Sequence, residues 1–157
     1  MDLYLLRHGD AVEDGFDDAS RPLSSIGEEQ ARFAANALRR LEAPPEIILS
    51  SPLTRAMQMA RIVQEALDIK KVGVTEYLIP GTDLQLLIRE IHKLAPARAL
   101  LVGHEPLLSG FISLLISGAQ NSRVEMKKGS LACLEAAPPI KPGTCTLKWL
   151  LTPDQMK

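Results

Sequence analysis

The chain has few cysteines, few aromatic residues and no long hydrophobic run, and these shortages exclude several classes of protein. Only two cysteines occur in the 157 residues, Cys133 and Cys145, and they form no CxxC pair. We therefore expect two reduced thiols rather than a disulfide framework. No apolar run approaches the ~20 residues that a membrane-spanning helix requires. The apolar start, Met1 to Leu6, is too short for a secretory signal, so we expect a cytoplasmic protein that does not bind membranes.

Strong charge of either sign is also missing. The formal net charge is -1, so there is no basic field that could hold nucleic acid, and any anion-binding site must be local. Hydrophobic residues make up 46% and charged residues 24%, as in ordinary globular proteins. Neither an internal repeat nor a linker interrupts the chain. We expect a single domain over residues 1–157, present as a monomer.

Short apolar runs alternate with longer amphipathic stretches along most of the chain. The runs predict strands over residues 3–6, 47–49, 72–76, 99–102, 131–135 and 144–150. Helices are expected in the three gaps between the first four strands and again over residues 107–116, whereas the last two strands have no helix between them. Ser25 and Glu28 have the spacing of a capping box, and Ser51 before Pro52 is typical of a helix start. The pattern predicts an α/β fold, with a mostly parallel sheet covered on both faces and an antiparallel C-terminal part. Strand order does not follow from it.

Basic side chains occur where three of the predicted strands end, and ligands of open α/β sheets bind at that edge. Arg7, His8 and Gly9 follow the first strand, Arg55 lies in the first turn of the helix after the second, and His104 follows the fourth. Two guanidinium groups, two imidazoles and a helix N-terminus suit a phosphoryl group, and Gly9 leaves room for close approach of the backbone. No Walker loop, GxGxxG or metal-ligand cluster competes with this set, so we expect neither a cofactor nor a metal ion.

A phosphate site needs a nucleophile before it can be an enzyme. No cysteine lies near the arginines, whereas neutral imidazole can form a phosphoramidate that water later cleaves. His8, between Arg7 and Gly9, is the better candidate for attack, and His104 can hydrogen-bond the phosphoryl oxygens. Because His8 must be neutral to attack, we expect its second ring nitrogen to donate to a backbone carbonyl near Gly9.

The motifs together resemble the histidine phosphatase superfamily, also called the phosphoglycerate-mutase-like or RHG family, from residue 3 to about residue 118. They are Arg7-His8-Gly9, the helix start Ser51-Pro52-Leu53-Thr54-Arg55-Ala56, and Val102-Gly103-His104. The small size, Asp10 after the first motif and the run Arg21-Pro22-Leu23-Ser24 are similar to the SixA-type branch, the phosphohistidine phosphatases. The resemblance implies a phosphoglycerate-mutase-like three-layer α/β/α sandwich. It implies that His8 attacks phosphorus while Arg7, Arg55 and His104 bind the phosphoryl group. Arg21 is a candidate substrate contact, with a surface ion pair as the alternative.

One departure from the family bears on the substrate. Many members place a carboxylic acid after the third strand to protonate the leaving oxygen, and residues 77–82 carry none; Glu76 and Asp83 flank the segment without matching the pattern. Imidazole leaves more easily than an alkoxide, because the P–N bond is labile and the ring can be protonated from solvent or by His104. Short loops over residues 9–24 and 77–82 leave little sequence to form a lid. Both points favour phosphohistidine on a protein, for example a histidine-phosphotransfer domain. A broad phosphomonoesterase for small metabolites and a non-catalytic phosphate-binding module are the alternatives.

Overall fold

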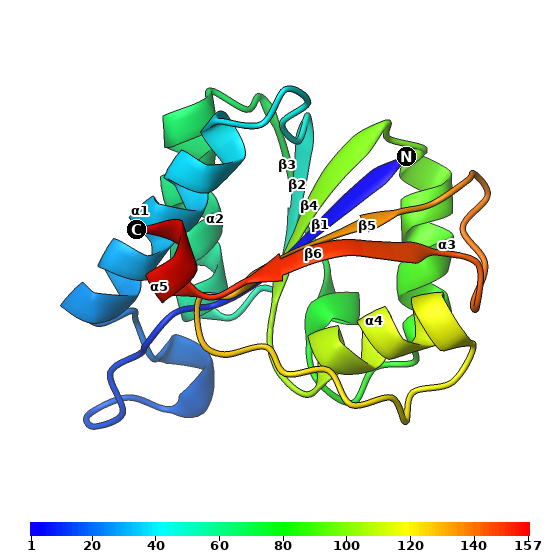
Figure 1. The fold of residues 1–157 in the computed structure, drawn as a ribbon. Helices are drawn as coiled ribbons and strands as arrows, with labels where there is room; N and C mark the ends of the chain where they lie inside the picture. Colours follow the sequence, from blue (N-terminus) through cyan, green and yellow to red (C-terminus); the bar gives the residue numbers. More distant parts are fainter.

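A six-stranded sheet forms the centre of the molecule (Figure 1), whose computed structural model describes residues 1–157. The strand order is β3-β2-β4-β1-β5-β6. β1 to β4 run parallel, and β5 is antiparallel to both of its neighbours. The strands are β1 (Asp2–Arg7), β2 (Ile47–Ser50), β3 (Lys71–Val74), β4 (Arg98–Gly103), β5 (Leu131–Glu135) and β6 (Thr146–Leu151). The predicted parallel sheet with an antiparallel C-terminal part is confirmed.

Helices cover both faces of this sheet, and β1 shows why. Successive side chains of a strand point to opposite faces, and all of those from Leu3 to Leu6 are apolar and buried. Leu3 and Leu5 belong to a core shared with α3 (Leu84–Leu94) and α4 (Leu107–Ser117). Tyr4 and Leu6 belong to a second core, shared with α1 (Ser25–Arg39), α2 (Thr54–Leu67) and α5 (Pro153–Met156). The two helix layers lie on either side of the sheet in Figure 1, so the predicted three-layer α/β/α sandwich is confirmed.

Several predicted boundaries shift. The N-cap of α1 is Ser24, whose Oγ accepts the N–H of Gly27 at 3.1 Å, so the capping box predicted at Ser25 is wrong by one residue. The third strand ends at Val74, and Glu76 opens the short 3-10 helix η2 (Glu76–Leu78) instead. The last strand begins at Thr146 rather than residue 144, and α5 was not predicted.

The helix most apolar in sequence, α4, is buried as predicted. Gly118 ends it in the left-handed conformation with φ 84°, and its N–H donates to the carbonyl of Leu114 at 2.9 Å. None of the helices in the molecule has the length and apolar character needed to cross a membrane.

Candidate active site

The parallel strands bring two histidines to one edge of the sheet. Arg7 and Gly103 are opposite each other in the β1–β4 ladder, so the next residues, His8 and His104, are neighbours. The N–H of His8 donates to the carbonyl of Gly103 at 3.0 Å, which extends the ladder past the ends of both strands. The ring centroids of His8 and His104 are 5.0 Å apart, and both residues are buried. The predicted convergence of the two imidazoles is therefore observed.

His8 has one ring nitrogen whose role is fixed by its partner. Nδ1 lies 2.7 Å from the carbonyl oxygen of Gly9, and because a carbonyl only accepts, Nδ1 carries the proton. In the neutral ring Nε2 then has a lone pair, and it accepts the Nε–H of Arg55 at 3.3 Å. The predicted hydrogen bond to a carbonyl near Gly9 is observed, and it leaves Nε2 as the ring nitrogen with a lone pair.

Arg55 joins the site from the first turn of α2, which has no side-chain N-cap. Its Nη1 donates to the backbone carbonyl of Asp18 at 2.7 Å, and its Nη2 lies 3.5 Å from the Asp18 carboxylate. Asp18 belongs to the 3-10 helix η1 (Asp18–Ser20) in the loop between β1 and α1. This loop therefore covers Arg55 and forms a wall of the site. The site is more enclosed than we expected from the short length of the loop.

Two nitrogen atoms of the site are buried without any hydrogen-bond partner. They are Nε of Arg7 and Nδ1 of His104, and the hydroxyl of Ser130 is unpartnered as well. Ser130 is next to Arg7 across the sheet, since its carbonyl accepts the Arg7 N–H at 3.0 Å. A buried polar group without a partner destabilises a protein by about 1–3 kcal/mol. Such atoms on the residue that precedes His8 and on the ring of His104, 5.0 Å away, indicate a site built for a polar ligand that supplies the missing partners.

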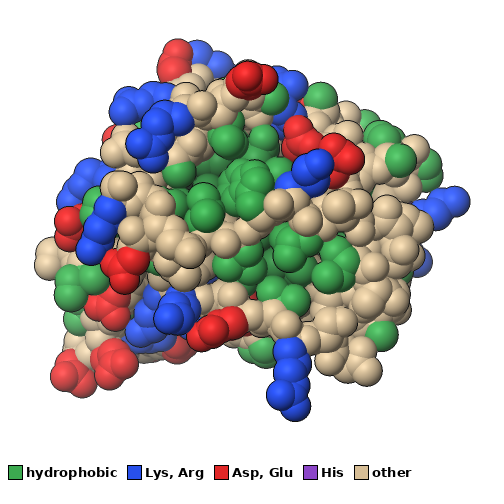
Figure 2. Space-filling model, in the orientation of Figure 1, with side chains coloured by type: hydrophobic (Ala, Val, Ile, Leu, Met, Phe, Trp, Pro, Cys, Tyr) green, Lys and Arg blue, Asp and Glu red, His purple; other side chains and the backbone are tan.

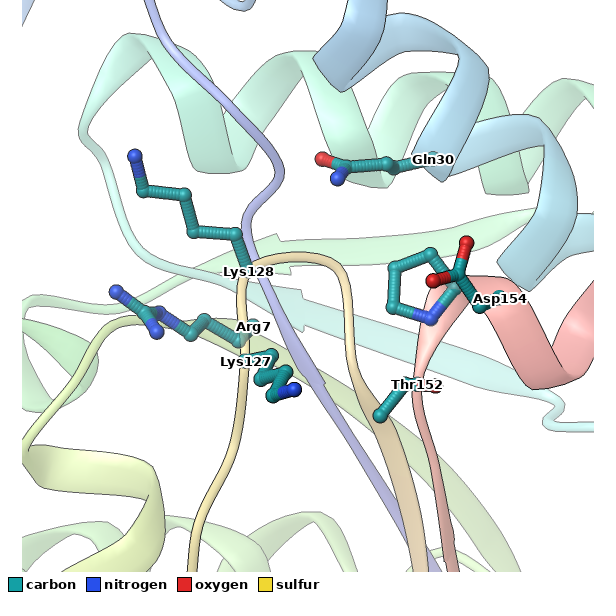
Figure 3. Close-up of a pocket in the computed structure, with 7 residues that line it drawn as sticks. Arg7, Gln30, Lys127, Lys128, Thr152 and Asp154 are labelled. Atoms are coloured by element: carbon teal, nitrogen blue, oxygen red, sulfur yellow. The ribbon is translucent and has the colours of Figure 1, made fainter.

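The side chain of Arg7 is held by the loop that precedes β5. Its Nη1 donates to the carbonyl of Met126 at 2.8 Å, and the charge of this guanidinium group acts on both histidines by lowering their pKa values. Arg7 also lines a polar cavity of about 390 Å³ with Lys127 and Lys128 of this loop (Figure 3). In Figure 3 the Arg7 and Lys128 side chains extend in the same direction, away from Thr152 and Asp154.

A serine that the sequence analysis interpreted as a helix cap contacts His104 instead. Ser51 is fully buried, and its Oγ lies 2.7 Å from Nε2 of His104. The same oxygen accepts the N–H of Leu53 at 3.3 Å, but α2 begins only at Thr54, so Ser51 is not its N-cap. Because Ser51 engages Nε2, the unpartnered Nδ1 of His104 is the atom left for a ligand.

Burial keeps both histidines neutral. It lowers the pKa of His8 to about 4, an effect that the Gly9 carbonyl opposes and the Arg55 and Arg7 cations reinforce. Burial likewise lowers the pKa of His104 to about 3, helped by the charges of His8 and Arg55. At neutral pH His8 therefore has its nucleophilic lone pair, and His104 has no ionisable proton to give.

Two carboxylates of the loop beside the site are ionised. The Ser24 hydroxyl, which donates to the Asp10 carboxylate at 2.7 Å, lowers the pKa of Asp10, and Lys128 adds to this. The Arg55 cation lowers the pKa of Asp18 in the same way. The two flanking acids noted in the sequence are elsewhere: Glu76 is exposed on η2, and Asp83 caps α3 by accepting the Gln85 N–H at 2.9 Å. No candidate general acid among these four carries a proton into the site.

The two predicted substrate contacts, Gly9 and Arg21, have other neighbours. A Cβ on Gly9 would lie 2.7 Å from Oε1 of Gln30 and 2.9 Å from Cα of Gly27, so the close approach at Gly9 is made by α1. Arg21 forms an ion pair with the Asp18 carboxylate at 3.2 Å, the alternative raised for it. Arg21 therefore contacts Asp18, which in turn pairs with Arg55.

Comparisons with known proteins agree with this geometry. Residues 3–79 match the family model of the histidine phosphatase superfamily (branch 1). An uncharacterized protein of Picosynechococcus sp. is 33% identical over 141 residues, which cover 87% of this chain and 86% of that protein. The phosphohistidine phosphatase SixA of Escherichia coli (strain K12) is 27% identical over 161 residues, which cover 100% of this chain and 97% of SixA. The solved structure of the protein histidine phosphatase SixA complexed with tungstate has a TM-score of 0.90 at 27% identity, and the match covers 100% of both chains.

Proposed function

The chain belongs to the histidine phosphatase superfamily and is a phosphatase, and we propose that it removes the phosphoryl group of phosphohistidine on a protein through a covalent phospho-His8 intermediate. The observation that carries the proposal is the position of the Nε2 lone pair of His8. Two buried nitrogens without partners belong to its neighbours: one to Arg7, the preceding residue, and one to His104, whose ring centroid is 5.0 Å from that of His8. A phosphoryl group bound between these residues accepts hydrogen bonds from the two unpartnered nitrogens. Its phosphorus atom then lies within reach of the Nε2 lone pair of His8.

The two arginines and His104 form the proposed cradle for the phosphoryl oxygens. Arg7 Nε and His104 Nδ1 donate to them, and Arg55 adds a second guanidinium group. SixA, to which the chain is similar over its full length, holds tungstate in its solved structure, and tungstate is a tetrahedral oxyanion like phosphate. Phosphoryl transfer depends mostly on positioning and charge stabilisation, which this set provides.

The first proposed step exchanges one imidazole for another. The Nε2 lone pair of His8 attacks phosphorus, so the bond to His8 forms while the P–N bond to the substrate ring breaks. The electron pair of the broken bond stays on the substrate imidazole, which leaves as a neutral ring because its other nitrogen carries a proton from solvent. The carbonyl of Gly9 stabilises the positive charge that develops on the phosphorylated His8 ring, since it accepts from Nδ1 at 2.7 Å.

In the second step water attacks phospho-His8. A P–O bond to the water forms as the P–N bond breaks, inorganic phosphate leaves with both protons of the water, and the electron pair returns to Nε2. The enzyme is then neutral again at His8, as its lowered pKa requires.

The absence of a protonated acid supports this leaving group over an alkoxide. Asp10 and Asp18, two carboxylates of the loop beside the site, have lowered pKa values, and His104 is neutral with a pKa of about 3. An alkoxide would leave without a proton donor, which slows the reaction by about 10²–10⁴-fold. A phosphorylated imidazole that arrives with its own ring proton needs no such donor.

Trapping the intermediate tests the proposal. A histidine-phosphotransfer domain labelled with ³²P serves as donor, and the reaction is stopped in alkaline detergent because phosphohistidine is acid-labile. We expect label on the wild-type chain and none on His8→Ala. The third histidine, His92, provides the matched control: its Nε2 lies 2.8 Å from the carbonyl of Ile140, outside the site, so His92→Ala must retain the label. Label on His8→Ala overturns the assignment.

Small phosphorylated metabolites are the second substrate class, and the polar cavity beside Arg7 favours testing them. Its lining includes Lys127, Lys128 and Gln30, which could bind the polar groups of a sugar or glycerate phosphate. A panel of such compounds is assayed beside the phosphohistidine protein. A higher kcat/KM for any metabolite than for the protein assigns the enzyme to the alternative, whereas binding of phosphate without turnover of either class assigns it to a non-catalytic module.

A further inference from the structure

The loop that walls the phosphoryl site carries a concentration of negative charge. Residues 10–18, here called the acidic rim, contain five carboxylates and no lysine or arginine, in a chain whose net charge is only -1. Asp10 and Asp18 are paired with Lys128, Arg21 and Arg55. The other three, Glu13, Asp14 and Asp17, are exposed and form no ion pair.

The acidic rim is attached directly to the site. Asp18 accepts two contacts from Arg55, whose Nε donates to the nucleophilic nitrogen of His8. In Figure 1 the acidic rim is the blue loop that projects beyond the end of β1, and acidic side chains gather at the same lower left corner in Figure 2. The acidic rim is therefore joined to the ring of His8 through a single arginine.

Exposed apolar side chains accompany the charge. The molecule has four exposed large hydrophobic residues, and three of them belong to the acidic rim or to the first turn of α1 next to it: Val12 at 36% exposed, Phe16 at 50% and Ile26 at 58%. The fourth, Val74, lies at the opposite edge of the sheet on β3. A folded protein gains nothing from exposing Phe16 at a loop tip, whereas apolar groups inside a charged border are typical of a protein-binding surface.

The site behind the acidic rim independently calls for a ligand, because Nδ1 of His104, a residue only 2% exposed, has no partner there. The proposed ligand is an anion, and three exposed, unpaired carboxylates on the loop beside the site repel a free phosphate monoester. A phosphoryl group carried on a basic surface is attracted instead, since opposite charges raise association rates by 10–10³-fold. The loop therefore favours a positively charged partner surface, whereas the site behind it favours a negatively charged phosphoryl group on that same partner.

We propose that the acidic rim docks a substrate protein whose surface around the phosphorylated histidine is rich in lysine and arginine. The inference rests on the proposed function and adds a partner to it. Glu13, Asp14 and Asp17 contact the basic groups, and Phe16 and Val12 pack against the apolar part of the partner surface.

Two phosphohistidine peptides that differ only in their flanking residues test the proposal. One carries lysines around the phosphohistidine and the other glutamates, and both are phosphorylated with phosphoramidate. We expect the wild type to hydrolyse the lysine peptide with a kcat/KM at least about tenfold higher at low salt, and the preference to shrink as added salt screens the charges.

The variant Glu13→Gln/Asp14→Asn/Asp17→Asn is expected to lose the preference while hydrolysing phosphoramidate itself at least as fast as the wild type. Asn at position 17 can still cap η1, where Asp17 accepts the Ser20 N–H at 2.9 Å. The matched control, Glu42→Gln/Glu65→Gln/Asp68→Asn, removes the same charge from exposed positions near the far ends of α1 and α2 and should keep the preference. For the apolar part, Phe16→Ala should raise KM for the lysine peptide, and Val74→Ala should not.

The possible outcomes distinguish a failure of the docking proposal from a failure of the proposed phosphatase function. Equal hydrolysis of the two peptides by the wild type, or a preference for the glutamate peptide, overturns docking and leaves the phosphatase proposal standing. A preference that survives in the triple variant also overturns it. Failure to hydrolyse either peptide, together with no label on His8, overturns the proposed function itself.

Discussion

The hydroxyl oxygen of Ser51 lies 2.7 Å from Nε2 of His104, and both residues are almost completely buried. This contact determines which ring nitrogen of His104 carries the proton. The Ser51 oxygen already accepts the Leu53 N–H and its hydroxyl has no other acceptor, so it donates to Nε2 and leaves the ring proton on Nδ1, the atom that has no partner. Only in that form can His104 donate to a phosphoryl oxygen while remaining neutral. Ser51 is thus a positioning residue for His104.

Removing the hydroxyl should impair turnover more than it impairs stability. In Ser51→Ala the ring of His104 is free to hold its proton on either nitrogen, so we expect kcat/KM to fall by about tenfold, the equivalent of one neutral hydrogen bond of about 1.4 kcal/mol. Nitrogen NMR of the ring should show both tautomers in the variant and one in the wild type.

Ser50 provides the control for this experiment. It is equally buried, and its Oγ donates to the carbonyl of Ser51 at 2.9 Å rather than to His104. Ser50→Ala should lose a similar amount of stability with little change in kcat/KM. Equal losses of activity in the two variants would mean that Ser51 acts through packing alone.

Strand-end chemistry was predictable from the sequence, whereas the contact between Ser51 and His104 was not. The carboxyl ends of parallel strands meet at one edge whatever their order, so His8, Arg55 and His104 could be brought together from the pattern alone. Ser51 reaches His104 because β2 and β4 are adjacent, and its N–H donates to the carbonyl of Val102 at 3.0 Å. Strand order depends on long-range packing that no local pattern encodes.

The start of α1 shows the same limit on a smaller scale. Two adjacent serines, Ser24 and Ser25, are both chemically able to cap a helix. What selects Ser24 is a contact from another part of the chain: its hydroxyl also bonds the Asp10 carboxylate, and the backbone of Gly27 packs against the carbonyl of Asp10. The capping-box spacing from Ser25 to Glu28 carried no information about that contact.

Replacement of Gly27, where α1 packs against the loop that walls the site, is expected to destabilise the protein strongly. A Cβ there would overlap the carbonyl oxygen of Asp10, a backbone atom that cannot rotate away. Gly27→Ala should therefore lower the free energy of unfolding by about 3 kcal/mol despite the better helix propensity of alanine. In the control Gly110→Ala, inside α4, the new Cβ lies 3.4 Å from the flexible Gln120 side chain, so a gain of about 0.5–1 kcal/mol is expected. Chemical denaturation of both variants measures the difference, and equal stabilities would contradict it.

Arginine rather than lysine is required at position 55. The guanidinium group of Arg55 bonds His8 through Nε and the Asp18 carbonyl through Nη1, a fork that a single ammonium group cannot reproduce. Arg55→Lys should lower kcat/KM by about 10²-fold or more while the fold is kept. Arg21→Lys should change it less than about threefold, because Arg21 contacts only the exposed carboxylate of Asp18 and lysine can still pair with it. A large loss in Arg21→Lys would restore Arg21 as a substrate contact.

The two buried histidines should make the protein acid-sensitive in a defined range of pH. In the folded protein the pKa values of His8 and His104 are lowered to about 4 and about 3, whereas an unfolded chain titrates near the ordinary value of 6.5. Between those limits the unfolded state binds more protons, so their contribution to stability is fully present above about pH 6.5 and is lost as pH falls toward 4. We expect the free energy of unfolding to fall by about 3 kcal/mol between pH 7 and pH 5. Asp10 and Asp18, whose pKa values are also lowered, contribute only below that range, where unfolded carboxylates gain protons.

Urea denaturation at pH 7, 6 and 5 measures the slope, and the variant His8→Gln/His104→Gln should flatten it. If the double variant keeps the wild-type slope, the acid sensitivity arises outside the site and the two rings are not held neutral by their burial.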